Sequence, residues 1–379
     1  MRGERRAAAV TPYLLVGLVA AVVTYVATPV VRWGSLRFGA IDHPNDRKVH
    51  AHPTPTLGGI ALLLGLVVAG VVASQMREFE AVFTASSEAL GILAGGVIIF
   101  ALGFVDDLRD LPAPVKLAGQ VFASGILFLS GVKMQFVLLP GGAYNLSDDV
   151  SVLVTVLWLV AMINAVNLVD GLDGLAAGIV AIAAASFFVY TYDFDVRGFY
   201  AGVPTAPLVA IVVVGSALGF LRHNFHPARI FMGDSGSMLL GFVLGATTVA
   251  GIGHAPQINP GVPGTQVFFA YFPLVIPLMV IALPIVDALL AIVRRARRRR
   301  SVFHADKEHL HHRLMDLGHG HRQAVLVMYL WSALAAGAGL AFRFVDRNQF
   351  IYGLPIAVGA IVLYTLFPVL TKAIQDRLG

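Results

Sequence analysis

Carboxylate and amide side chains recur at short intervals in one stretch of the 379-residue sequence, and both groups can bind a hard cation. Four such residues follow one another at intervals of three: Asn164, Asn167, Asp170 and Asp173. Residues at i and i+3 share one face of a helix, so this spacing predicts a row of oxygen ligands. Asn164 and Asn167 also lie within an apolar run, where hydrogen bonding to a neighbouring helix is the alternative.

Another carboxylate stands in a glycine-bracketed turn, Gly233-Asp234-Ser235-Gly236, directly before an apolar run. Backbone amides at the start of a helix suit a phosphate, and the carboxylate suits Mg²⁺. A helix cap without any ligand is the alternative for Asp234. The turn is therefore a candidate site for a metal-bound phosphate.

Adjacent carboxylates, Asp106 and Asp107, end a further apolar run. They repel each other unless a cation or a general-base role accounts for them, and a solvated loop start is the alternative. Three histidines later in the chain form another polar cluster: His309, His311 and His312. Their spacing resembles that of zinc ligands, but no second cluster completes a tetrahedral site, so we expect contact with phosphate or substrate.

The elements that position these residues must be membrane-spanning helices. Hydrophobic residues make up 57% of the chain and charged residues 13%, against about 25% in a soluble domain. About eleven apolar blocks can cross a bilayer, which takes about 20 helical residues: 12–31, 57–76, 89–105, 114–132, 151–168, 174–190, 205–221, 237–253, 267–293, 325–342 and 351–371. We therefore expect an all-α polytopic membrane protein, one domain over 1–379 with no separate soluble domain. No cysteine occurs, which excludes disulfide and thiolate chemistry.

Charge sorts the connecting loops into two sets. Most of the 27 Lys and Arg residues lie in the loops after odd-numbered spans and in the C-terminal tail, although the N-terminal basic cluster lies in the other set. The positive-inside rule therefore assigns the odd loops to the cytoplasm. Those loops also carry every polar cluster named above, which predicts one active site at the cytoplasmic face. We interpret the arginine-rich stretch 294–300 as an anchor to anionic headgroups, and nucleic-acid binding is not expected.

Together these groups favour phosphoryl transfer between a soluble phosphorylated donor and a membrane-bound acceptor, because oxygen ligands suit Mg²⁺ and basic groups suit phosphates. No G-x-x-x-x-G-K-[ST] sequence occurs, so an ATP-driven machine is unsupported. An ion-coupled transporter is the rival class, favoured by Asp287 within an apolar run, but it would need more polar residues near mid-membrane. A lipid-binding scaffold, the third class, would not need Asn and Asp in register.

Five motifs follow one another along essentially the whole chain: Pro-Thr-Leu-Gly-Gly at 55–59, the pair at 106–107, Asn-Ala-Val-Asn-Leu-Val-Asp-Gly-Leu-Asp-Gly-Leu at 164–175, Phe-Met-Gly-Asp-Ser-Gly-Ser at 231–237 and His-Leu-His-His at 309–312. In this order they resemble the motifs of the polyprenyl-phosphate N-acetylhexosamine-1-phosphate transferases, the MraY/WecA superfamily. Members of that family join a UDP-aminosugar to a polyprenyl phosphate and release UMP.

The histidine motif separates two branches of that family. Peptidoglycan translocases, which use UDP-MurNAc-pentapeptide, typically have three successive histidines followed by Phe-Glu, whereas a leucine follows His309 here. The motif is similar to that of the WecA/TagO-like branch, which starts teichoic acid, O-antigen or arabinogalactan. The resemblance therefore implies transfer of GlcNAc-1-phosphate from UDP-GlcNAc to undecaprenyl or decaprenyl phosphate, the first membrane step of a cell-envelope glycopolymer. A UDP-MurNAc-pentapeptide transferase is the alternative.

The resemblance also implies roles for individual residues. Asp106 would contact the polyprenyl phosphate, as a base or by positioning it, with Asp107 beside it as the second catalytic residue. Asn167 and Asp234 would help to hold Mg²⁺, for which Mn²⁺ could substitute, on the diphosphate of the donor. The remaining candidates would bind substrate: Lys48, Lys116, Asn164, Asp170, Asp173, His309, His311, His312 and Arg313.

Within that last group, Asp170 and Asp173 would line the nucleotide site and Lys116 would bind the acceptor phosphate. The implied partners are UDP-GlcNAc, a polyprenyl phosphate carrier and the surrounding membrane lipids, and a homodimer is compatible with the sequence. The implied location is the bacterial cytoplasmic membrane. A single in-line step is favoured over a covalent phospho-aspartate intermediate.

Overall fold

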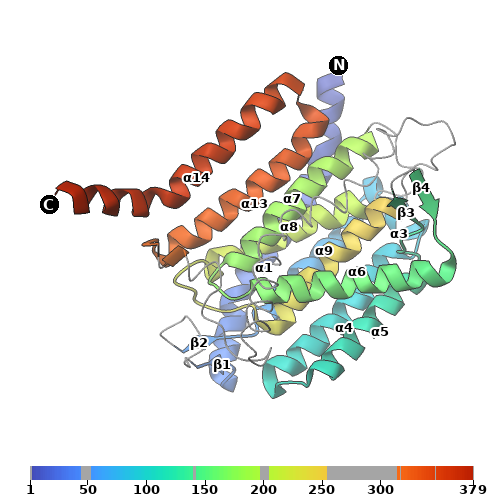
Figure 1. The fold of residues 1–379 in the computed structure, drawn as a ribbon. Helices are drawn as coiled ribbons and strands as arrows, with labels where there is room; N and C mark the ends of the chain where they lie inside the picture. The colour runs from blue at the N-terminus through green and yellow to red at the C-terminus, as the bar shows by residue number, and fades with distance from the viewer. Residues whose placement is uncertain are drawn as a thin grey trace.

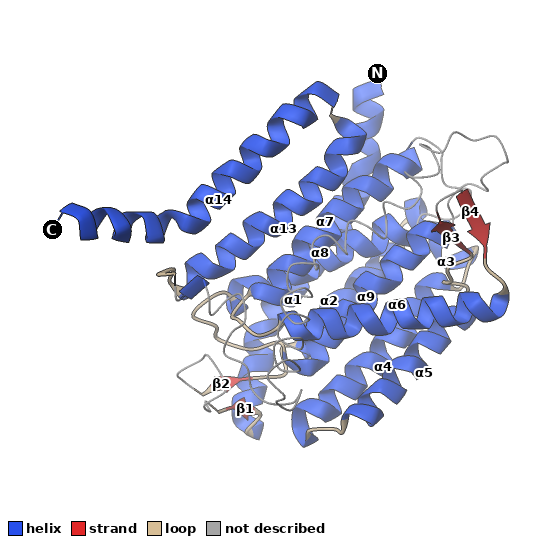
Figure 2. Cartoon of the chain, in the orientation of Figure 1, coloured by secondary structure: helices blue, strands red, loops and turns tan. Residues whose placement is uncertain are grey.

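The computed structural model describes residues 2–43, 53–139, 142–196, 205–253, 314–315, 317–345 and 347–378, and these residues are mostly helical (Figures 1 and 2). The helices are α1 Arg2–Phe38, α2 Gly59–Ser74, the 3-10 helix η1 Arg77–Phe79, α3 Glu80–Thr84, α4 Glu88–Arg109, α5 Ala113–Leu129, α6 Asp148–Val169, α7 Leu175–Val196, α8 Thr205–Asn224, α9 Gly233–Gly253, α13 His321–Phe344 and α14 Arg347–Leu378. Two small antiparallel hairpins pair β1 Ile41–Asp42 with β2 Thr54–Pro55, and β3 Phe136–Leu139 with β4 Gly142–Asn145.

Ten of the eleven apolar blocks coincide with helices, and the block 267–293 lies outside the described residues. Within the described part, six helices are long and apolar enough to cross a membrane, or seven if α2 and the η1–α3 segment form one span bent by 96°. The chain is therefore a polytopic membrane protein, while the number of eleven spans stays a prediction.

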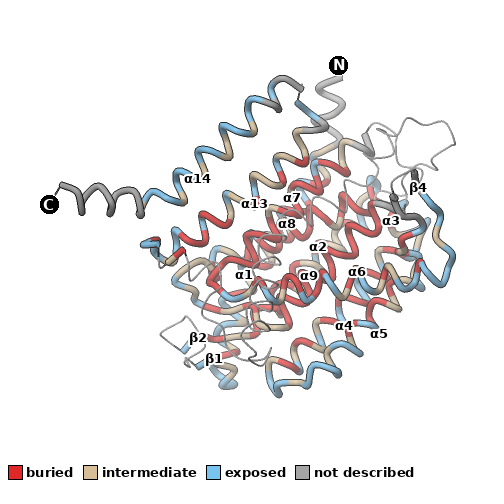
Figure 3. Tube along the Cα trace, viewed as in Figure 1, coloured by how far each residue is buried: buried red, intermediate tan, exposed pale blue. Residues whose placement is uncertain are grey.

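Burial divides the helices into an inner and an outer group (Figure 3). The inner helices are α7, α8 and α9: α8 packs against α7 and the outer helix α1, and α9 packs against the outer helices α4 and α6. The apolar windows of α7 and α8 are 72% buried, whereas those of α4 and α6 are 39% buried. Outer helices expose large apolar side chains such as Leu93 and Leu153. Helices that are apolar around their whole circumference suit a lipid environment.

Small residues bring α8 into close contact with α1. A Cβ on Gly215 would lie 2.0 Å from the backbone oxygen of Gly17, and a Cβ on Gly219 would lie 2.3 Å from that of Ala21. The four-residue spacing of these glycines therefore serves helix packing.

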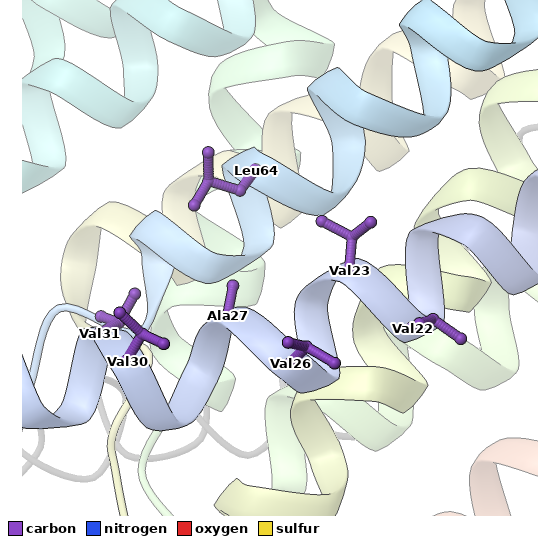
Figure 4. A pocket seen from close by; sticks show the side chains of 7 residues that line it. All are labelled: Val22, Val23, Val26, Ala27, Val30, Val31 and Leu64. Carbon is purple, nitrogen blue, oxygen red and sulfur yellow. The ribbon is translucent and has the colours of Figure 1, made fainter.

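An apolar groove lies between α1 and α2 (Figure 4). It is lined by Val22, Val23, Val26, Ala27, Val30, Val31 and Leu64. Val22, Val26 and Val30 are more than half exposed, so lipid chains can cover this face of α1.

The polar motifs meet at one end of the bundle, opposite the β3–β4 hairpin (Figure 1). Hydrogen bonds there join the end of α4 to the start of α9, the end of α6 to the start of α9, and the turn after α6 to the loop before α9. The expected gathering of these clusters at one face is therefore confirmed for the described residues.

Candidate active site

Lys116, in the first turn of α5, lies between two carboxylates. Its Nζ is 2.7 Å from Oδ2 of Asp106 and 3.3 Å from Oδ2 of Asp234. Asp106 also accepts a hydrogen bond of 2.7 Å from the backbone N–H of Leu111, in the short connection from α4 to α5. Asp106 is almost fully buried, at 5% exposure, whereas Lys116 is 30% exposed. The ammonium therefore offsets buried negative charge and still faces the outside of the cluster.

Asp107 caps the start of α9 from the end of α4. Its Oδ1 accepts a hydrogen bond of 2.7 Å from the N–H of Asp234, and its Oδ2 accepts one of 3.1 Å from the N–H of Ser235. A Cβ on Gly233 would lie 2.5 Å from the Asp107 carboxylate, and the φ of Gly233 is +70°. The glycine before Asp234 is therefore needed both for the turn and for this close approach.

Asn167 bonds to Oδ1 of Asp234, the carboxylate oxygen that Lys116 does not contact. Its Nδ2 donates to Oδ1 of Asp234 at 3.0 Å and to Oγ of Ser237 at 2.9 Å. With Lys116 on Oδ2 and Asn167 on Oδ1, the Asp234 carboxylate is fixed from two helices. The side-chain oxygen of Asn167 remains for a cation as far as the described residues are concerned.

Asp170 follows the last residue of α6 and lies near the other carboxylates of this cluster. Burial raises the pKa of Asp170 to about 8, and the negative charges of Asp234, Asp107 and Asp173 add to the shift. The carboxylates of Asp106, Asp107 and Asp234 also lie in this cluster, and Lys116 is the cation bonded to it in the described part of the chain, so carboxylates outnumber bonded cations there. Hard oxygen ligands with excess negative charge fit a divalent cation, so the residues present are suited to Mg²⁺.

The Pro-Thr-Leu-Gly-Gly motif supports this site through its backbone. The N–H groups of Gly58 and Gly59 donate to the backbone oxygens of Phe231 and Met232, each at 2.9 Å. A Cβ on Gly59 would lie 2.5 Å from the backbone nitrogen of Gly236. The first and fourth motifs therefore form one packed unit, which fixes the start of α9.

Asn164 lies one turn before Asn167 on α6, and its side chain contacts another helix. Its Nδ2 donates to Oε1 of Gln120 at 2.7 Å, and Gln120 is buried on α5. Interhelical hydrogen bonding, the alternative that the sequence left open for both asparagines, is observed for both, because Asn167 bonds to Asp234 and Ser237 on α9. The assignment of Asn164 to substrate binding stays a prediction.

The expectation of one helix face for the four residues at intervals of three is wrong for the last two. The helix ends at Val169, and the chain turns through Asp170 to Gly174, whose φ is +80°. Asp173 therefore points away from the α6 face and lies against the loop between α8 and α9. There its Oδ2 is 2.7 Å from Nδ1 of His226 and accepts a hydrogen bond of 3.0 Å from the N–H of Ala228.

Sequence reasoning missed several residues of this site. Gln120 gave no pattern of its own, and its role follows only from packing. His226, in the loop between α8 and α9, and His321, the first residue of α13, stack with ring centroids 4.0 Å apart and an interplanar angle of 15°. The nearness of His226 to the Phe231–Ser237 motif is the one signal that could have found it.

Five of the predicted substrate-binding residues lie outside the described residues. They are Lys48, His309, His311, His312 and Arg313. Asp287 and the arginine-rich stretch 294–300 also lie outside that part.

Comparisons with known proteins identify the family of this chain. The profile of glycosyl transferase family 4 matches residues 89–252, which include α4 to α9. A decaprenyl-phosphate N-acetylglucosaminephosphotransferase from Mycolicibacterium smegmatis is 41% identical, over 94% of this chain and 89% of its own length. An undecaprenyl-phosphate alpha-N-acetylglucosaminyl 1-phosphate transferase from Yersinia pestis is 28% identical, over 82% of this chain and 79% of its own length.

The other branch is also represented. A phospho-N-acetylmuramoyl-pentapeptide-transferase from Desulforudis audaxviator is 36% identical, but over 63% of this chain and 76% of its own length. Identity of 41% over nearly the whole length of the mycobacterial relative, with the matching profile and the five motifs, settles the family. The chain belongs to glycosyl transferase family 4, within the superfamily of polyprenyl-phosphate N-acetylhexosamine-1-phosphate transferases that its motifs resemble.

Proposed function

We propose that the protein transfers GlcNAc-1-phosphate from UDP-GlcNAc to a polyprenyl phosphate, with release of UMP. The observation that carries this proposal is a chain of side-chain hydrogen bonds at one end of the bundle of apolar helices. It connects Asp106, Lys116, Asp234 and Asn167. A membrane-bound phosphate and a soluble nucleotide sugar can meet at such an edge. The names of two relatives of similar length describe transfer of an N-acetylglucosamine phosphate group to decaprenyl or undecaprenyl phosphate.

The acceptor phosphate belongs on the Lys116 side of the site. In the proposed reaction a phosphate oxygen of the carrier attacks the β-phosphorus of the donor in line, a P–O bond forms, and the bond to the UMP oxygen breaks. The acceptor phosphate is already largely ionised at pH 7, so Asp106 contributes more by positioning than by removing a proton. Lys116, held by Asp106, can move to the phosphate because it is partly exposed.

The donor diphosphate belongs near Asn167 and Asp234. The side-chain oxygens of these two residues would bind Mg²⁺ or Mn²⁺. The carboxyl group of Asp170 is close enough to Asp234 to interact with its charge. A divalent cation at this place would neutralise charge on the diphosphate and on the departing UMP. Asp107 and the Gly233 turn keep the first backbone amides of α9 in place beside it.

The preferred donor is expected to be UDP-GlcNAc. A MurNAc-pentapeptide is much larger and carries charged groups, so its site needs extra room and extra partners. The predicted sugar-phosphate contacts, His309, His311, His312 and Arg313, suit a compact diphosphate and an acetamido sugar.

A membrane assay tests the function and the branch together. Labelled UDP-GlcNAc and polyprenyl phosphate should give a lipid-soluble labelled product and UMP, and an Asp234→Asn protein should give roughly two orders of magnitude less. UDP-MurNAc-pentapeptide at the same concentration should be a poor donor. Preferential turnover of the pentapeptide donor would move the protein to the peptidoglycan branch, and no product with either donor would sink the transferase assignment.

We further infer that this site faces the cytoplasm of a bacterial cell. The chain has no cysteine, so single cysteines can report topology. A cysteine at Ala143, on the β3–β4 hairpin, should react with an impermeant thiol reagent added outside, and a cysteine at Ala305 should not. Equal labelling at the two positions would overturn the orientation.

A further inference from the structure

Asp173, His226 and His321 come from three separate parts of the chain and lie next to one another, and the family resemblance implies that Asp173 lines the nucleotide site. Asp173 lies in the turn between α6 and α7, His226 in the loop between α8 and α9, and His321 begins α13. One donor atom from each residue lies within 4.8 Å of the others.

The carboxylate of Asp173 is held through one of its two oxygens. Its Oδ2 is 2.7 Å from Nδ1 of His226 and accepts a hydrogen bond of 3.0 Å from the N–H of Ala228. Among the described residues both bonds fall on the same oxygen, which leaves Oδ1 for a donor outside this cluster. A carboxylate fixed on one oxygen presents the other in a defined direction.

His226 is itself held by the first two residues of α13. The ring of His321 stacks on the ring of His226, with centroids 4.0 Å apart and planes 15° apart. Nε of Arg322 donates to the backbone oxygen of His226 at 2.9 Å. The first two residues of α13 therefore fix both the ring and the backbone of His226. This helix follows the predicted histidine motif in the sequence.

The parallel rings argue against a preformed metal site at these three residues. Imidazole nitrogens bind metals through lone pairs in the plane of the ring, and the lone pairs of two parallel stacked rings cannot converge on one ion. The arrangement fits the pattern in which a second residue orients a functional group through a hydrogen bond.

The backbone of the turn has its own supports. The N–H of Gly174 donates to Oδ1 of Asn224 at 3.0 Å, and the hydroxyl of Tyr329 donates to the backbone oxygen of Gly174. These contacts hold the main chain, whereas His226 contacts the carboxylate of Asp173 itself. The two roles can therefore be separated by substitution.

We propose that His226 and His321 are positioning residues, which orient the carboxylate of Asp173 toward the nucleotide of the donor. This proposal rests on the proposed function. His226 supplies the hydrogen bond, and His321 keeps the ring of His226 in the plane from which that bond is made. The start of α13 is thereby coupled to nucleotide binding.

Two substitutions at His226 separate the hydrogen bond from the stack. His226→Phe keeps an aromatic ring against His321 but removes the donor to Asp173. His226→Asn removes the ring but places an amide nitrogen near the position of Nδ1. We expect His226→Phe to raise KM for UDP-GlcNAc about tenfold with kcat changed less than about threefold, because the lost bond orients bound nucleotide in ground and transition states alike. His226→Asn should restore KM to within about threefold of the unmodified value.

His319 provides a matched control. It lies two residues before His321, and its Nε2 is 2.8 Å from the backbone oxygen of Thr365 on α14, so it ties the same region without reaching Asp173. His319→Phe should leave KM for UDP-GlcNAc unchanged, and His321→Ala should raise it. Thermal unfolding of each variant in detergent shows whether the fold is kept.

Three results would overturn the proposal: an unchanged KM in His226→Phe, equal KM values in His226→Phe and His226→Asn, or a rise in KM in His319→Phe as large as in His226→Phe. Calorimetric titration with UDP gives a second readout that needs no turnover, and His226→Phe should weaken UDP binding by the same factor. If the unmodified protein turns over UDP-GlcNAc and the His226 variants bind UDP as tightly as it does, the positioning role alone is refuted. An unmodified protein that neither turns over UDP-GlcNAc nor binds UDP refutes the proposed function and this inference together.

Discussion

Asp107, at the end of α4, accepts a 2.7 Å hydrogen bond from the backbone N–H of Asp234, at the start of α9. A carboxylate at this place interacts favourably with the unpaired N–H groups and the positive end of the helix. Asp107 therefore caps the first turn of α9, while the Asp234 side chain bonds to Lys116 and Asn167. Two adjacent carboxylates at the end of α4 thus have different neighbours, since Asp106 bonds to Lys116 and Asp107 bonds to backbone.

The cap predicts different effects for two substitutions at Asp107. Asp107→Ala removes both acceptors, so we expect a loss of about 0.5–2 kcal/mol in stability together with a fall in kcat. Asp107→Asn keeps one acceptor oxygen and should be closer to the unmodified protein in thermal unfolding. Paired measurements of unfolding temperature and turnover check this, and equal stability of all three proteins would contradict the capping role.

Turnover is predicted to depend on Lys116 but not on Lys133, which lies just after the same helix. Lys116→Met leaves Asp106 and Asp234 without their cation and removes the proposed contact to the acceptor phosphate. We expect kcat/KM to fall by about two orders of magnitude or more, which is typical for loss of a charge-stabilising group. The measurement is turnover at varied polyprenyl phosphate concentration.

The control for that measurement is Lys133→Met. Lys133 lies just after α5, at the end far from the site, and its Nζ is 3.8 Å from Oδ1 of the exposed Asp148. Exposed ion pairs contribute little to stability, so this variant should keep near-normal activity. A similar loss in both variants would show that charge on this segment matters in general and that Lys116 has no special role.

Metal dependence follows from the oxygen ligands around Asp234. Activity should vanish on chelation and return with Mg²⁺ or Mn²⁺, and Asp234→Asn should lower turnover by roughly two orders of magnitude. Asp148→Asn, at the other end of α6, is the matched control and should respond to metal as the unmodified protein does. An Asp234→Asn protein with a normal rate and normal metal response would refute the assignment of Asp234 as a ligand.

Asp170 predicts a pH dependence of stability in the presence of a chelator. An unfolded carboxyl group releases its proton near pH 4, whereas the folded one keeps it up to its pKa of about 8. Between these values the folded state binds more protons, so the contribution of this group to the free energy of unfolding falls as pH rises. Asp170→Asn should remove that fall, with an unfolding temperature higher than that of the unmodified protein by about 5–10 °C at pH 8 and unchanged at pH 4. Parallel unfolding curves for the two proteins from pH 4 to pH 8 would contradict the prediction.

The sequence was sufficient for the helices but not for the contacts between them. Apolar blocks are long and continuous, so hydropathy alone located ten helices that the structure contains. The interval of three from Asn164 to Asp173 marked polar residues at the end of α6 and in the turn after it. It could not show that α6 stops at Val169, which directs Asn167 to Asp234 and Asp173 to His226. The capping of α9 by Asp107 was equally hidden, because it joins residues 127 positions apart.

Asn164 and Gln120 provide the last prediction, which separates a role in substrate binding from a role in helix packing. Gln120 follows Lys116 by one turn on α5, and Asn164 precedes Asn167 by one turn on α6, so their hydrogen bond fixes the two helices next to the site. Loss of Asn164 alone leaves the buried Oε1 of Gln120 without that donor, at a cost of about 1–3 kcal/mol. We therefore expect Asn164→Leu to lower both stability and turnover, and the double variant Asn164→Leu, Gln120→Leu to recover part of each, because two apolar side chains leave no unpaired amide. A double-mutant cycle on unfolding temperature and kcat measures this coupling. Additive losses of turnover in the double variant would instead favour direct contact between Asn164 and a substrate.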